Sequence, residues 1–141
     1  MKIKSCGVIP FIRSENLIKV LIIKHLDGHW SFPKGQKDPD ESDLETAKRE
    51  FSEETGITDF KIFEDKSFIE KYSFTRNDKK IEKEVVFFLA EVNNEGVKIQ
   101  EEEVSEYSWL DYENTLKLLT HEETAQILMD AFNYLYKYRQ L

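Results

Sequence analysis

The first part of the chain shows two strand-like runs of hydrophobic residues. Residues 2–13 and 17–24 are rich in branched and aromatic side chains, and the polar segment 14–16 separates them. Two such runs around a short polar segment predict a β-hairpin. Residues 25–35, His-Leu-Asp-Gly-His-Trp-Ser-Phe-Pro-Lys-Gly, contain glycine and proline and predict a loop without regular structure.

The middle of the chain predicts further strands. Residues 58–75 alternate between apolar and polar positions, which favours one or two strands. A turn is expected over residues 76–80, followed by a long strand over residues 81–92. The sequence Asn-Asn-Glu-Gly at 93–96 predicts the next turn.

A helix is predicted between Ser42 and Gly56. Ser42 followed three residues later by Glu45 matches a capping box, and Gly56 stands where a helix commonly ends in a left-handed glycine. One apolar stripe follows the helical period, formed by Leu44, Ala47 and Phe51.

The last part of the chain predicts two helices after an anchor at Trp109 and Leu110, which we expect to be buried. A short helix begins at Asp111 or Tyr112 and ends at Leu119. A longer helix covers residues 121–138, with one apolar face made of Ala125, Leu128, Phe132 and Leu135. Strands, a helix, strands and then helices indicate a mixed α/β fold with sheet and helices in layers. With 141 residues, we expect a single domain over 1–141.

Composition and charge narrow the class of protein. Hydrophobic residues make up 40% and charged residues 34%, which is typical of a soluble globular chain. The formal net charge of −8 argues against non-specific binding to nucleic acid or to an anionic membrane. Cys6 is the one cysteine, so no intramolecular disulfide forms, and we expect it to be a buried core residue rather than a nucleophile. Without a signal peptide or an apolar run near ~20 residues, we expect a cytoplasmic protein outside membranes.

The segment 35–57 is unusually acidic. It carries eight acidic side chains, and at the helical period Glu50, Glu53 and Glu54 fall on one arc. Carboxylates one turn apart repel each other unless a cation lies between them. Hard divalent cations such as Mg²⁺ prefer oxygen ligands and are commonly held by a few carboxylates plus phosphate oxygens. The segment thus predicts a metal-holding helix, with an ordinary solvent-facing acidic helix as the alternative.

The spacing within this segment resembles the Nudix box, the signature of the Nudix hydrolase family. Its seven fixed positions all match, at Gly35, Glu41, Arg49, Glu50, Glu53, Glu54 and Gly56. An accidental match of seven fixed positions is on the order of one in a million at ordinary residue usage. Phe51 is bulkier than the aliphatic residue usual there, which affects packing rather than chemistry. The resemblance implies an α/β/α sandwich with a mixed β-sheet and a loop–helix–loop metal site.

The chain also resembles one group within this family, the asymmetric bis(5′-nucleosyl)-tetraphosphatases, nearly from end to end. The stretches that carry this likeness are SCGVIPF, HWSFPKG, DLETAKRE, VVFFLAEV and EVSEYSWL. The resemblance implies hydrolysis of dinucleoside polyphosphates, diadenosine tetraphosphate to ATP and AMP, by metal-activated water with Mg²⁺, or Mn²⁺, as cofactor. The alternative substrates are another nucleoside diphosphate derivative or the 5′ triphosphate end of RNA. A non-catalytic nucleotide sensor is a third alternative, against which the intact box argues.

The resemblance also implies a role for each matching residue. The expected metal ligands are Glu50, Glu53, Glu54, Glu103 and the carbonyl oxygen of Gly35. Glu41 is expected to pair with Arg49, and Arg49 to orient Glu50. Either Glu53 or Glu103 is expected to accept a proton during the reaction.

The remaining expected site residues bind the substrate. The polyphosphate is expected to contact His29, Lys34 and Lys83, because lysine supplies a compact positive charge for phosphate. Tyr72 or Phe74 is expected to stack on the adenine. His25 is a further candidate for phosphate or metal contact, although isolated loop histidines are more often plain surface residues.

Overall fold

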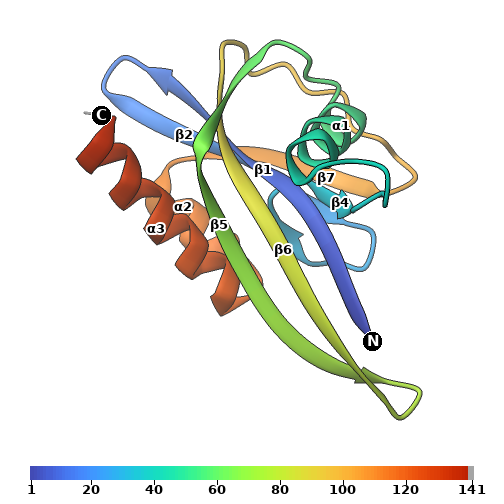
Figure 1. Cartoon of the computed structure of the whole chain (residues 1–141). Helices are drawn as coiled ribbons and strands as arrows, with labels where there is room; N and C mark the ends of the chain where they lie inside the picture. Colours follow the sequence, from blue (N-terminus) through green and yellow to red (C-terminus); the bar gives the residue numbers. More distant parts are fainter. Residues whose placement is uncertain (140–141) are drawn as a thin grey trace.

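The centre of the molecule is a sheet built around β1 (Lys2–Ser14), as Figure 1 shows for the computed structural model, which describes residues 1–139. The strand β1 pairs antiparallel with β2 (Leu17–His25), so the predicted hairpin is confirmed. On its other side β1 pairs parallel with β6 (Lys79–Val92), which pairs antiparallel with β5 (Phe60–Arg76). The sheet is therefore mixed, as predicted.

Three shorter strands complete the sheet. The strand β3 (Trp30–Ser31) and the strand β7 (Val104–Leu110) both pair with β2. The strand β4 (Lys34–Gln36) pairs antiparallel with the first half of β1, where Gly35 lies opposite Cys6. This pairing joins the segment before the acidic helix directly to the central strand.

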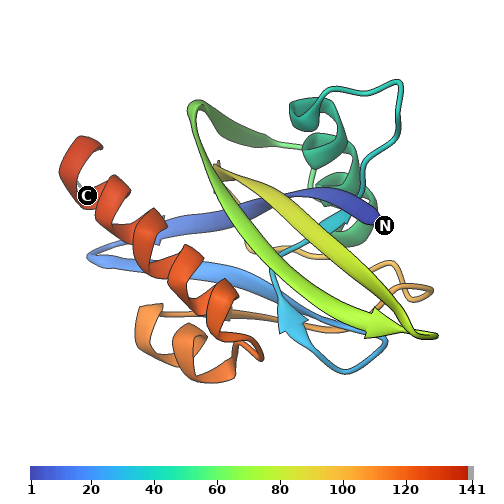
Figure 2. The ribbon, with the colours of Figure 1, turned by 60° about the horizontal axis from the view of Figure 1, so that its bottom comes forward.

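Helices cover both faces of the sheet. The helix α1 (Asp43–Thr55) lies on one face, and α2 (Tyr112–Leu118) and α3 (Glu122–Tyr138) lie on the other (Figure 2). Each face has its own hydrophobic cluster, one joining the sheet to α3 and one joining it to α1. The α/β/α sandwich is thus confirmed, and so are the two predicted C-terminal helices.

The strand β1 is apolar on both faces, which explains its central position. Ile9 and Phe11 belong to the cluster under α3, whereas Cys6 and Val8 belong to the cluster under α1. A strand covered on both sides reads as a continuous hydrophobic run rather than as an alternation. Cys6 is fully buried, as predicted.

The helix α1 begins and ends as its sequence predicts. The Ser42 hydroxyl accepts a hydrogen bond from the Glu45 amide, and the Glu45 carboxylate accepts one from the Ser42 amide. Gly56 ends the helix at φ +72°, in the left-handed region that favours glycine. Of the predicted stripe, Ala47 and Phe51 are fully buried and Leu44 is half-buried.

The prediction of an irregular loop over residues 25–35 is wrong, because β3 and β4 begin within it. Pro33 lies between the two strands, where its missing amide hydrogen costs no strand pairing. Its carbonyl oxygen accepts a hydrogen bond from the Val8 amide. The proline thus interrupts the pairing without separating this segment from the sheet.

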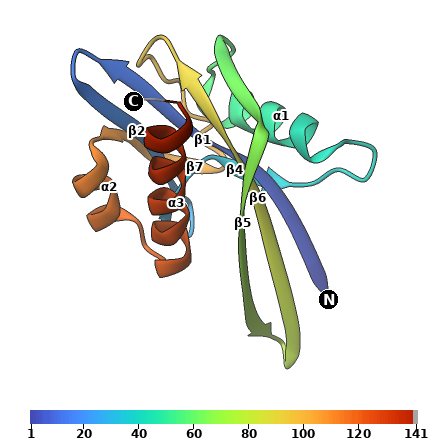
Figure 3. The same ribbon diagram turned by 60° about the vertical axis from the view of Figure 1, so that its left-hand side comes forward.

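The long hairpin of β5 and β6 extends away from the rest of the molecule (Figure 3). Residues 60–76 form one strand, whose pairing with β6 is irregular between Ile62 and Ser67. The predicted turn over 76–80 is shorter in the structure, because only Asn77 and Asp78 lie between the strands. Both have positive φ, 52° and 62°, as a tight two-residue type I′ hairpin turn requires.

The predicted turn at residues 93–96 is present, with a bend at Asn93 and a hydrogen bond from the Gly96 amide to Asn94 Oδ1. The chain then runs to the end of α1. The Lys98 amide donates to the Thr55 carbonyl, and the Gln100 amide donates to the Glu54 carbonyl. The chain then enters β7, a strand that the sequence pattern did not predict. Trp109 is half-buried rather than buried, and so is Leu110. No helix within residues 1–139 is long and apolar enough to cross a membrane.

Candidate active site

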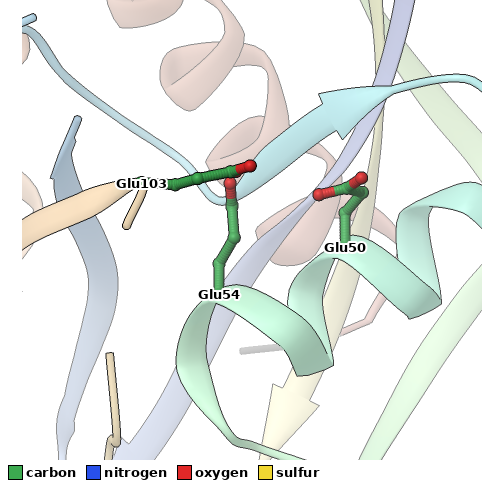
Figure 4. Close-up of side chains that lie close together, drawn as sticks. All are labelled: Glu50, Glu54 and Glu103. Carbon is green, nitrogen blue, oxygen red and sulfur yellow. The ribbon is translucent and has the colours of Figure 1, made fainter. Parts of the chain in front are cut away.

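Three carboxylates from two distant parts of the chain meet beside the sheet. Glu50 and Glu54 project from α1, and Glu103 reaches them from the turn before β7 (Figure 4). One oxygen from each lies within 4.8 Å of the others. The hydrogen bond from Gln100 to the end of α1 brings Glu103 to this position.

Glu54 is the most deeply placed of the three carboxylates. Only 1% of its surface is exposed, and its Oε1 accepts a hydrogen bond from the Lys34 amide at 2.9 Å. Burial, with Glu50 beside it, raises the pKa of Glu54 to about 8. Burial also raises the pKa of Glu50. Two buried carboxylates side by side are costly without a cation.

Arg49 connects the acidic cluster to the start of the box. Its Nε and Nη2 donate to the two carboxylate oxygens of Glu41, at 2.7 and 2.9 Å. Its Nη1 donates to Glu50 Oε1 at 2.9 Å. Hydrogen bonds from Arg49 lower the pKa of Glu41 to about 2. The geometry is the one expected if Arg49 orients Glu50.

Glu53 lies outside the group formed by Glu50, Glu54 and Glu103. Its side chain is 46% exposed, and it accepts long hydrogen bonds of 3.3 and 3.4 Å from Arg49 Nη1. The structure thus brings two of the three helical glutamates together with Glu103, while Glu53 stays beside them at the surface.

The cluster fits a hard divalent cation. All three donors are carboxylate oxygens, the type that Mg²⁺ prefers. Within residues 1–139, no side-chain nitrogen of a lysine or arginine lies within 4.0 Å of the Glu54 or Glu103 carboxylate. Gly35 borders the site so closely that an added Cβ would lie 2.0–2.4 Å from the Glu50 carboxylate atoms. The clustered negative charge, and the close approach that glycine allows here, suit a bound cation.

An open groove of about 450 Å³ runs past the acidic cluster. Glu54, Glu103 and Gly35 are among the residues that line it. Its other lining residues include four of the predicted substrate contacts, His29, Lys34, Lys83 and Phe74. Burial, with Lys83 close by, lowers the pKa of Lys34 to about 8. Carboxylates and lysines thus face one shared space.

His25, the last residue of β2, and His29 contact neighbouring side chains rather than standing free at the surface. His29 Nδ1 contacts the Asp27 carboxylate, and the His29 ring stacks on His25 with centroids 4.4 Å apart. Burial lowers the pKa of His29. Burial also lowers the pKa of His25, to about 3, so His25 is neutral at physiological pH. Both rings line the groove.

Tyr72 does not line the groove, although Phe74 does. Tyr72 stacks between Phe74 and His121, with ring centroids 6.2 and 6.5 Å away. His121 precedes α3 and also lies 5.7 Å from His29. Sequence reasoning missed His121, because only the packing of α3 against β5 brings it here, and nothing local marks it.

Sequence reasoning also missed Arg76 and Glu70. The strand period could have found both, because Glu70, Tyr72, Phe74 and Arg76 share one face of β5. Arg76 lines the groove. Glu70 is 5% exposed and accepts a hydrogen bond from Thr124, and burial raises its pKa.

The amino-acid sequence is similar to those of two named enzymes over most of its length. It is 34% identical over 144 residues to the bis(5′-nucleosyl)-tetraphosphatase [asymmetrical] of Rattus norvegicus, covering 96% of this chain and 97% of the relative. It is 32% identical over 125 residues to the m7GpppN-mRNA hydrolase of Saccharomyces cerevisiae, covering 85% of this chain but 12% of that relative.

The fold also matches solved structures over nearly the whole chain. A binary complex of Ap4A hydrolase from Caenorhabditis elegans superposes with a TM-score of 0.84 at 26% identity, covering 96% of this chain and 99% of that one. The model of the NUDIX domain matches residues 1–132. With the box, the sandwich and the carboxylate cluster in place, this match shows that the chain belongs to the NUDIX domain family and is a Nudix hydrolase.

Proposed function

We propose that residues 1–141 form a single Nudix domain that hydrolyses dinucleoside polyphosphates with Mg²⁺, converting diadenosine tetraphosphate to ATP and AMP. The observation that carries this proposal is the shared groove, in which carboxylates face Lys34 and Lys83. The named activities of the rat and C. elegans relatives support the choice of substrate.

Glu50, Glu54 and Glu103 would hold the metal, with the Gly35 carbonyl oxygen as a further ligand. When bound, a divalent cation lowers the pKa of a coordinated water and neutralises phosphate charge. Mn²⁺ also accepts carboxylate oxygens, so it is the expected substitute for Mg²⁺. In this arrangement Arg49 holds the Glu50 carboxylate in place through Nη1.

Lys34 and Lys83 would bind the phosphate oxygens and stabilise negative charge that develops during attack at phosphorus. His29 contacts Asp27 and lines the same groove, so it would add a hydrogen bond to the polyphosphate chain of the substrate. Glu53 and Glu103 are the two candidates for accepting the proton of the attacking water. Glu53 is available for this role because it lies outside the carboxylate cluster.

The nucleobase would pack against an aromatic side chain that lines the groove, which is Phe74. Tyr72 and Arg76 already lie over the Phe74 ring, so we place the base against its edge. Tyr72, nearly parallel to the His121 ring at an interplanar angle of 24°, would support this surface.

A second candidate function is hydrolysis at the 5′ end of RNA, which the likeness to the yeast m7GpppN-mRNA hydrolase favours. The net charge of −8 counts against a long RNA, whose binding depends on basic contacts. Both candidates use the same acidic cluster, so only the identity of the substrate separates them.

The deciding experiment is hydrolysis of diadenosine tetraphosphate with Mg²⁺ in ¹⁸O-labelled water, with the products identified by mass. ATP and AMP, with the label in AMP, are expected. Two molecules of ADP would overturn the asymmetric cleavage. No turnover, together with cleavage of triphosphate or capped RNA, would replace the proposed substrate by the second candidate.

Two glutamine variants test the acidic cluster. Glu54→Gln and Glu103→Gln should each lower kcat by two orders of magnitude or more, because each removes a charged metal ligand. Glu101→Gln, in the same turn as Glu103, is the matched control and should keep kcat within about twofold. Wild-type turnover of Glu54→Gln at saturating Mg²⁺ would refute the metal site.

A further inference from the structure

We propose that Arg76 is a specificity-determining residue, which binds substrate phosphates beyond those held at the acidic cluster. It would give the enzyme a preference for substrates with long polyphosphate chains. This inference rests on the proposed function and identifies a contact that lies outside the box and its flanking segments.

Among the residues that line the groove, Arg76 lies nearest to the turn of the β5–β6 hairpin. It is the last residue of β5, and its side chain lines the same groove as Glu54, Glu103 and Lys83. The hairpin of β5 and β6 extends beyond the rest of the sheet (Figure 3), so Arg76 stands near its tip. The two-residue turn at Asn77 and Asp78 fixes the pairing of Arg76 with Lys79.

Arg76 is the one arginine within residues 1–139 that has no carboxylate partner. Arg13, Arg49 and Arg139 each pair with an acidic side chain at 2.7–2.9 Å. The Arg76 guanidinium instead lies 5.3 Å from the centre of the Phe74 ring. Stacking on a ring occupies the flat face of a guanidinium and leaves its N–H edge free to donate.

The free edge of this guanidinium suits phosphate. An arginine fork donates two parallel hydrogen bonds to phosphate oxygens, which a carboxylate-paired arginine cannot offer. The groove already holds two other cationic side chains, since Lys34 and Lys83 line it together with Arg76. A phosphate chain that starts at the acidic cluster would pass these cations.

The distance from the acidic cluster determines which substrates Arg76 can contact. Lys83 pairs across the sheet with Tyr72, and Arg76 comes four residues after Tyr72. At a rise of roughly 3.3 Å per residue, the two backbone positions are about 13 Å apart along the strand. A ligand with two phosphates at the acidic cluster would meet Lys83 before Arg76, whereas a longer polyphosphate would extend to both.

The test compares chain lengths in Arg76→Ala, Arg76→Lys and the control Lys80→Ala. Lys80 pairs with Thr75, so its side chain lies on the opposite face of the hairpin. We expect Arg76→Ala to lower kcat/KM about tenfold for diadenosine tetraphosphate and pentaphosphate, and less than twofold for ADP-ribose. Arg76→Lys should fall between, and Lys80→Ala should match the wild type for every substrate.

Two outcomes would overturn the proposal. An equal loss for all substrates would mean that Arg76 only supports Phe74 and the hairpin. No loss for any substrate would mean that Arg76 does not contact the phosphates.

A binding measurement keeps this test separate from the proposed function. If the wild type cleaves no diadenosine polyphosphate, the proposed function fails, yet Arg76 can still be tested by calorimetry. With Mg²⁺ present, Arg76→Ala should weaken binding of inorganic tripolyphosphate about tenfold. An unchanged Kd would overturn the role of Arg76.

Discussion

At the scale of single residues, the site depends on how a few charged groups are held. Arg49 uses its whole guanidinium fork, with two nitrogens on Glu41 and the third on Glu50. The resemblance to the Nudix box implied this trio and a ligand role for Gly35, and the likeness to the tetraphosphatases implied Glu103. Neither implied that Glu53 would lie outside the carboxylate cluster, since the Glu53 side chain meets Arg49 at the helix surface instead.

Replacing Arg49 by lysine should lower kcat/KM by about 10- to 100-fold, the range for groups that orient metal ligands. Lysine keeps the charge but has no fork, so Glu41 and Glu50 cannot both be held. Steady-state kinetics at saturating Mg²⁺ measures this change. Lys48→Arg, on the exposed side of the same helix, should leave kcat/KM unchanged; an Arg49→Lys enzyme with normal kinetics would contradict the orienting role.

The pKa of Glu41 predicts a pH dependence of stability. Arg49 lowers this pKa to about 2 in the folded protein, below the ordinary 4.5. A depressed carboxyl pKa stabilises the fold above about pH 4.5, and this stabilisation is lost as the pH falls toward 2. The Tm of Glu41→Gln should therefore lie below that of the wild type at pH 7, and the gap should narrow between pH 5 and 3.5. A gap that stays constant over this range would rule out the ion pair as its cause.

At the scale of elements, the short strand β4 joins the box to the sheet. Its pairing with β1 brings the Lys34 amide to Glu54 and places Gly35 against Glu50. The sequence predicted the helix α1 in detail because its capping box and terminal glycine are local signals. It did not predict β3, β4 or β7, since strands of two or three residues and the polar β7 carry almost no periodicity of their own.

Two glycines on this pairing should respond differently to alanine. At Gly35 the added Cβ meets only the end of the Glu50 side chain, which can move away. Gly35→Ala should therefore lower Mg²⁺ affinity and turnover at least tenfold with little change in Tm. At Gly7 the Cβ lies 2.3 Å from the Pro33 carbonyl oxygen and 2.7 Å from Lys34 Cβ, so β4 itself must shift.

Gly7→Ala should thus lower both Tm and turnover. Calorimetry of the two variants, with Mg²⁺ titrated into each, measures this difference. If Gly35→Ala bound Mg²⁺ as the wild type does, the close approach of Gly35 to the Glu50 carboxylate would not matter for function.

At the scale of the whole molecule, the two faces of the sheet differ in what they carry. The helix α1, on one face, carries two of the three clustered carboxylates, whereas the larger hydrophobic cluster lies under α3 on the other face. Binary patterning predicted both layers, because each helix has one apolar face. It could not place His121 beside Tyr72, since that contact needs α3 docked on β5.

Truncating the core at the far end of α3 should affect stability more than catalysis. Leu135 is fully buried, so Leu135→Ala should lower the unfolding free energy by about 2–5 kcal/mol. Urea unfolding measures this loss, with the exposed Lys137→Ala as control. Because Leu135 lies at the end of α3 remote from His121, the KM at low temperature should not change; a raised KM would show that the α3 face also shapes the groove.

The central position of β1 has a consequence for biosynthesis. The strand β1 leaves the ribosome before the other strands of the sheet, yet its long parallel partner β6 begins at Lys79. At about 5–20 residues per second, β6 follows roughly 4 to 16 s later. Until then β1, apolar on both faces, can form only its hairpin with β2 and its short pairing with β4. The nascent chain should therefore depend on chaperones during this interval, whereas the completed chain closes the sheet on its own.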